Sequence, residues 1–182
     1  MSTTATTLPT GTWNVDPTHS RVGFRVKHLG ISNVRGEFHD FDGQFVIAED
    51  GTATASGTVR VASIDTNEAN RDAHLKSADF FDADTYPEIT FQSTSITATD
   101  EDTYEVTGDL TMHGVTKPIT LTAEIGGSDA DMYGNTRIGL AATAELSRSD
   151  YGMTFNAALG SGNMIVSDNV KLELDLQAVK AE

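Results

Sequence analysis

The stretch "RVGFRVKH", residues 21–28, decides which fold class the sequence predicts. Val22, Phe24 and Val26 alternate with a glycine and three cations, which is the period-2 pattern of a β-strand with one apolar and one polar face. His28 continues the apolar face by one step. A neutral imidazole both donates and accepts a hydrogen bond, so His28 is a candidate for contact with a polar group at the rim of an apolar interior.

The same alternation recurs along most of the chain. Apolar side chains share one parity in residues 34–38, 41–47, 53–63, 88–92, 104–112, 119–125, 138–146 and 170–176. The parity changes between Phe38 and Phe41, which predicts a bulge there. About eight amphipathic strands separated by short turns are typical of an all-β antiparallel sandwich or barrel.

Two segments interrupt the strand pattern. Residues 65–87 contain helix formers after a candidate cap at Thr66 or Asn67, which predicts a short helix followed by a loop. Residues 147–163 have no regular periodicity, and we expect an irregular excursion there.

Composition limits the functions that the chain can have. Twelve Lys and Arg against 27 Asp and Glu give a net charge of −15, which repels nucleic acids, so no nucleic-acid partner is expected. The sequence has no cysteine, which excludes disulfides, thiolate zinc sites and a cysteine nucleophile.

Length and the N-terminal sequence predict the domain organisation. The 182 residues are enough for one domain, and we expect a disordered arm over residues 1–10 and a single barrel domain over residues 11–182. The segment "MSTTATTLPTG" has neither the basic nor the apolar part of a secretion signal, so a cytoplasmic location is expected. No apolar run reaches membrane-spanning length, so the protein is not expected to be an integral membrane protein.

Small residues lie on the apolar parity of two predicted strands. They are Ala53, Ala55 and Gly57 in one strand, and Ala142 and Ala144 in another. An eight-stranded barrel either fills with side chains or holds one small ligand. Small inward residues favour a ligand cavity, and the alternative is a core filled by large side chains from the facing strands.

The five histidines do not form a recognised catalytic or metal-binding motif. Asp16, His19 and Ser20 are too close in sequence to make a triad, because neighbours on a strand point to opposite faces. We therefore expect no catalytic residue, no metal and no cofactor. The alternative is a hydrolase-like enzyme that acts on a lipid or an amide through a His/Asp cluster.

The motif "RDAHL", residues 71–75, suggests a second polar group. In a helix, Arg71, His74 and Leu75 share one face, which presents a cation, an imidazole and an apolar contact together. Together with His28, this face would surround a polar head at the mouth of an apolar cavity. The alternative is that Arg71, paired with Asp72, only fastens the helix to the barrel.

Four blocks of sequence resemble a known family. They are "WNVDPTHSRVGFRVKHLGISNVRGEFHDFDG" (13–43), "RDAHLKSADFFDADTYPEITF" (71–91), "VTGDLTMHGVTKPITL" (106–121) and "LSRSDYGM" (146–153). In this order they are similar to the YceI-like family of polyisoprenoid-binding proteins. The resemblance implies a lipocalin-like antiparallel eight-stranded barrel whose apolar tunnel holds a long-chain isoprenoid lipid, such as a polyprenyl phosphate or an isoprenoid quinone. The resemblance is also compatible with a homodimer, and with a role as a carrier, a reservoir or a stress-related lipid binder.

We therefore expect the ligand to contact the inward faces of the strands and the helical segment. The expected contacts are Val22, Phe24, Val26, His28, Phe38, Ala55, Val59, Arg71, His74, Leu75, Phe80, Phe91, Leu110, Met112, Leu121, Ile138, Leu140 and Ala142.

Overall fold

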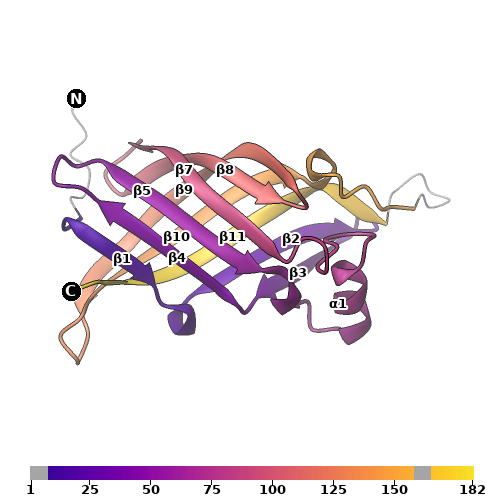
Figure 1. The fold of residues 1–182 in the computed structure, drawn as a ribbon, viewed down its shortest axis with the longest axis horizontal. Helices are drawn as coiled ribbons and strands as arrows, with labels where there is room; N and C mark the ends of the chain where they lie inside the picture. Colours follow the sequence, from indigo (N-terminus) through magenta and orange to yellow (C-terminus); the bar gives the residue numbers. More distant parts are fainter. Residues whose placement is uncertain (1–7, 158–164) are drawn as a thin grey trace.

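Eight antiparallel strands close into a ring in the computed structural model, which describes residues 8–157 and 165–182 (Figure 1). Neighbours in the ring follow the order β1, β4, β5, β7, β8, β9, β10, β11, and pairing of β1 with β11 closes it. The strands are β1 Gly11–Val15, β4 Phe41–Ile47, β5 Ala53–Arg60, β7 Glu88–Ala98, β8 Thr103–Met112, β9 Val115–Ala130, β10 Thr136–Ser147 and β11 Val166–Lys180. The predicted antiparallel eight-stranded barrel is confirmed.

Three further strands form a ribbon beside the ring. They are β2 Arg21–His28, β3 Ser32–Phe38 and β6 Ile64–Asp65. The long strand β11 pairs with β2 along its first part and with β1 at its end, so the ribbon branches from the ring at β11. The sequence pattern placed β2 and β3 in the ring and missed β1, because a five-residue strand is too short to display a clear alternation.

The change of parity between Phe38 and Phe41 has a different cause from the bulge that the sequence predicts. β3 ends at Phe38 and pairs with β2 and β6, whereas β4 begins at Phe41 and pairs with β1 and β5. The chain crosses here from the ribbon to the ring, and both phenylalanines are buried. The predicted strand 53–63 is likewise shorter, because β5 ends at Arg60 and a 3-10 turn, Val61–Ser63, follows.

The helix α1, Ala69–Lys76, confirms the predicted helix but starts at a different cap. Glu68 caps it by accepting a hydrogen bond from the backbone N–H of Arg71 at 2.6 Å. Thr66 instead donates its N–H and hydroxyl to Asp72, at 2.8 and 2.5 Å. Asn67 has a positive φ of 67°, so it turns the chain before the helix begins. None of the described helices is long and apolar enough to cross a membrane.

Among the described residues, buried apolar side chains form three clusters: one at each end of the barrel, and one made by Leu121, Ala123, Ala142 and Ala144 of β9 and β10. At one end Trp13, Ile138 and Ala178 pack together, and at the other end Tyr151 and Met153 pack with residues of β8 and β10. The predicted excursion begins with a 3-10 turn, Arg148–Tyr151, which joins β10 to the following loop. Its residues 158–163, and residues 1–7 of the predicted arm, lie outside the described residues.

Candidate functional site

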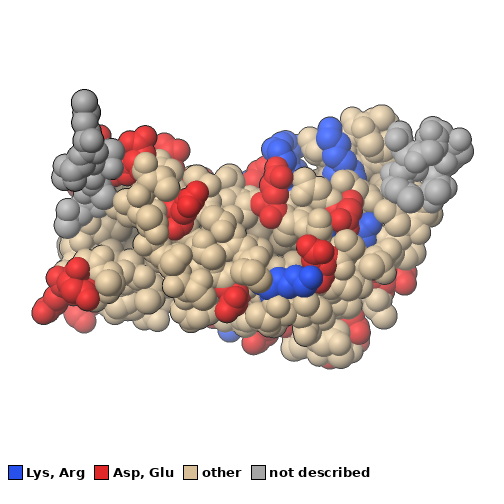
Figure 2. Space-filling model, turned by 90° about the horizontal axis from the view of Figure 1, so that it is seen from above, with Lys and Arg blue, Asp and Glu red and all other residues tan. Residues whose placement is uncertain are grey.

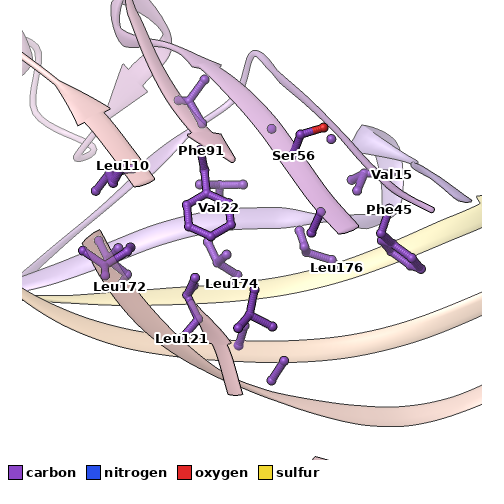
Figure 3. A pocket seen from close by; sticks show the side chains of 18 of the residues that line it. Val15, Val22, Phe45, Ser56, Phe91, Leu110, Leu121, Leu172, Leu174 and Leu176 are labelled. Atoms are coloured by element: carbon purple, nitrogen blue, oxygen red, sulfur yellow. The ribbon is translucent and has the colours of Figure 1, made fainter. Parts of the chain in front are cut away.

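An apolar cavity of about 1060 Å³ occupies the interior of the barrel (Figure 3). This volume lies slightly above the usual range for small-molecule sites, about 300–1,000 Å³. Fourteen of the residues predicted to contact a ligand line it: Val22, Phe24, Val26, Phe38, Ala55, Val59, Leu75, Phe80, Phe91, Leu110, Met112, Leu121, Leu140 and Ala142. Their position in the wall is a finding, whereas their contact with a ligand stays a prediction.

Strand alternation makes this wall apolar. Leu172, Leu174 and Leu176 of β11 all point inward, because side chains two residues apart lie on the same face (Figure 3). The polar residues Lys171, Glu173 and Asp175 of the same strand point outward by the same rule. The interior is therefore built for a molecule with a long apolar part.

Alanine keeps part of the interior open. Ala123 of β9 and Ala142 of β10 are cross-strand partners, and both are buried, at 8% and 5% exposed. Ala53 and Ala55 of β5 also line the cavity. Larger side chains at these positions would occupy the space that the cavity now takes, so the filled-core alternative is not favoured.

Two aromatic rings of the wall lie against glycines of neighbouring strands. Phe24 covers Gly36, its cross-strand partner, and Phe91 covers Gly108. A Cβ added to Gly108 would lie 2.5 Å from the carbonyl oxygen of Gln92 and would overlap the Phe91 ring. Glycine thus leaves room for each ring to lie over the neighbouring strand on the cavity side.

Two predicted contacts on strands do not reach the cavity. Ile138 is 1% exposed and packs with Trp13 and Ala178 in the core at one end of the barrel. His28 is half-buried and lies near the tip of the β2–β3 ribbon, opposite Ser32 and outside the cavity lining. By alternation, His28 lies on the same face of β2 as Val22, Phe24 and Val26. It does not meet the cavity, because the ribbon extends beyond the closed ring at this point.

The two predicted polar contacts on α1 also lie outside the lining. Arg71 donates from Nε to Thr66 Oγ1 at 2.8 Å and from Nη2 to the Thr66 carbonyl at 2.7 Å, so it fastens the helix. His74 bonds to Asp79 at 2.8 Å, and its ring stacks edge-on against Phe80 with centroids 5.0 Å apart. Of the three contacts predicted on this helix, Arg71, His74 and Leu75, only Leu75 lines the cavity.

Arg148 is a polar wall residue that the sequence reasoning did not select. It is 5% exposed, and its guanidinium donates to the carbonyls of Ser167, Met153, Phe155 and Val166 at 2.9, 2.8, 2.8 and 3.2 Å. Burial lowers the pKa of this guanidinium, against the opposing charge of a nearby aspartate. It lies in residues 147–163, which have no periodicity, so the sequence carries no signal for its place in the wall.

Charged groups outside the cavity form separate small networks. Arg137 bonds to Asp131 at 2.7 Å and to Asp16 at 2.8 Å, and Asp16 also bonds to His19 at 2.8 Å. Arg137, and then His19, lower the pKa of Asp16 to about 2. Figure 2 shows the Lys and Arg side chains of one face gathered in the half nearer α1. Among the described residues, no three of His, Asp and Glu come together as a metal site would require.

A closed antiparallel barrel with one long apolar cavity defines a lipocalin-like class of proteins, and comparison identifies the family. Residues 13–178 match the YceI-like domain, so the chain belongs to the YceI-like family. A UPF0312 protein of Photorhabdus laumondii is 44% identical over 144 residues, which are 78% of this chain and 73% of that protein.

Solved structures share the fold. The YCEI protein of Campylobacter jejuni is 33% identical, with a TM-score of 0.74 over 86% of this chain and 90% of the other. A polyisoprenoid binding domain from Saccharophagus degradans, implicated in plant cell wall breakdown, has a TM-score of 0.70 over 95% of this chain and 100% of the other. At 17% identity, this second likeness shows the fold alone.

Proposed function

We propose that this protein binds a long isoprenoid lipid in the barrel cavity and acts as a carrier or reservoir for it. The observation that carries the proposal is the continuous apolar cavity, whose lining reaches from the β4–β5 turn to α1. Membership of the YceI-like family, and the isoprenoid-binding description of the Saccharophagus degradans domain, support the same ligand class.

The energetics of burial favour a long hydrocarbon chain. Each methylene moved from water into an apolar site contributes about 0.8 kcal/mol. A few isoprene units therefore supply enough free energy for micromolar or tighter binding, after the entropic costs of association.

Native mass spectrometry of the protein purified from its own host tests the proposal. We expect a discrete adduct with the mass of an isoprenoid lipid, which is lost after extraction with organic solvent and restored by adding a polyprenyl phosphate or an isoprenoid quinone. If the protein carries no lipid and takes up neither compound, the proposal is wrong.

The enzyme alternative has less support. Three histidines pair with three different aspartates on the outside of the barrel: His19 with Asp16, His39 with Asp65, and His74 with Asp79. None of these three histidines lines the cavity. Turnover of a lipid ester or amide by the purified protein would favour the alternative. The homodimer stays a prediction, which sedimentation of the purified protein tests.

A further inference from the structure

Resting on the proposed function, we propose that Arg148 binds the phosphate head of the isoprenoid lipid. The chain would then extend away from α1, along the cavity toward the β4–β5 turn. This assignment replaces the predicted head-group contacts His28, Arg71 and His74, and it gives the bound lipid one orientation.

Arg148 is the only cation among the described residues that line the cavity. The wall residues that the structure places beside it are apolar: Phe80, Met153 and Val166. The centre of the guanidinium lies 5.9 Å from the centroid of the Phe80 ring. Four of the five guanidinium N–H groups bond to backbone carbonyls, which leaves one N–H of Nη2 and the positive charge to attract a phosphate oxygen.

The positive charge of Arg148 has no carboxylate partner within ion-pair distance among the described residues. Its contacts are four backbone carbonyls, which fix its position but carry no net charge. The nearby Asp168 accepts a hydrogen bond from the backbone N–H of Ser149 at 3.0 Å instead. Because buried charges are normally paired, an anion in the cavity would complete this site.

The far end of the cavity has the opposite charge. Glu49 and Asp50 of the β4–β5 turn line it there and are exposed. This turn and α1 lie at opposite ends of the barrel (Figure 1). A phosphate would be repelled by these carboxylates and attracted by Arg148, so the two ends favour the same orientation.

The single tryptophan of the chain can report this orientation. Trp13 stacks with the wall residue Phe45, with centroids 6.0 Å apart. It packs against Ala178, whereas Arg148 bonds to Val166 on the same strand, β11. At about 3.3 Å per residue, roughly 40 Å of strand separates these two points.

The first test measures binding of geranylgeranyl phosphate and geranylgeraniol to the wild-type protein. We expect the phosphate to bind roughly 10- to 100-fold tighter, as for hydrogen bonds to a charged group. Arg148→Met should remove this preference while the alcohol still binds, and Arg35→Met, on the outer face of β3, should keep it. Equal affinity of both compounds for the wild type would overturn the head-group assignment but leave the proposed function standing.

The second test needs no variant and stands even if Arg148→Met does not fold. Prenyl phosphates long enough to span this distance of roughly 40 Å, with bromine either at the terminal unit or at the unit beside the phosphate, are compared as quenchers of Trp13 fluorescence. We expect strong quenching by the terminal bromine only. Equal quenching, or stronger quenching by the head-side bromine, would overturn the orientation. Failure of every prenyl compound to bind would instead refute the proposed function.

Discussion

Filling the cavity with one side chain tests whether its open volume is what binds lipid. Ala142 of β10 lines the cavity, and its cross-strand neighbours are Ala123 and Leu174. In Ala142→Phe, the phenyl ring would project between these neighbours into the space that the lipid chain would occupy. The fold should tolerate the ring at some cost in stability, because the ring extends from a small buried cluster of Leu121, Ala123, Ala142 and Ala144 into the cavity.

The expected loss of affinity follows from the carbon atoms that the ring displaces. A phenyl ring excludes about five to six ligand carbons, and at about 0.8 kcal/mol for each buried methylene the loss is about 4–5 kcal/mol. This corresponds to a roughly thousandfold higher Kd. Titration of a fluorescent polyprenyl phosphate measures it.

The matched control is Ala141→Phe, because Ala141 is the preceding residue of β10 and is exposed on the outer face. The two variants have the same composition and differ only in the side of the wall that carries the ring. We expect the control to bind lipid like the wild type. If Ala142→Phe keeps the wild-type circular dichroism and binds lipid with unchanged affinity, the cavity is not the lipid site.

Three further variants test the wall, the outer charge network and the helix. Gly108→Ala should push the Phe91 ring away from β8 and further into the cavity, lowering the thermal midpoint and weakening lipid binding together; unchanged binding would refute the role given to this ring. Asp16→Asn removes a carboxylate whose pKa Arg137 holds at about 2, so it should lower the free energy of unfolding by about 1–2 kcal/mol above pH 5. Since the pKa of Asp16 is depressed in the folded state, the difference in free energy of unfolding between wild type and variant should shrink as pH falls from about 4 toward 2. Denaturant titrations measure it, and a difference that stays constant with pH would contradict the stabilising role given to the Asp16–Arg137 ion pair. Arg71→Leu should cost roughly 1 kcal/mol of stability and leave the preference for phosphate over alcohol intact; loss of that preference would return Arg71 to the head-group site.

Alternation along the chain was sufficient to predict the wall of the barrel. Inward parity depends only on the pleat of each strand, so the positions of Phe24, Leu110 and Ala142 followed directly from the sequence. The small residues of β5 and β10 likewise indicated an open interior. These features are local, and local features can be read without knowing how the strands pair.

The polar end of the cavity could not be predicted in the same way. His28 has the inward parity, but whether that face meets the cavity depends on β2 leaving the ring as part of a ribbon. Arg71 has the correct helix face, but it is held by Thr66, which a turn at Asn67 brings beside it. Arg148 lies in an irregular segment without periodicity, so its side-chain direction follows from tertiary contacts alone.

The contrast between wall and head group has a physical basis. Apolar contact is non-directional, so a wall needs only residues of suitable size on the inward face, and many sequences satisfy that requirement. A head-group site needs donors fixed in position, and the buried guanidinium of Arg148 achieves this by bonding to carbonyls of two segments, around residues 153–155 and 166–167. The excursion after β10 is therefore more than a connection between strands. Arg148, near the start of this excursion, supplies the fixed cation that the rest of the wall lacks, and so allows the two ends of the cavity to be chemically different.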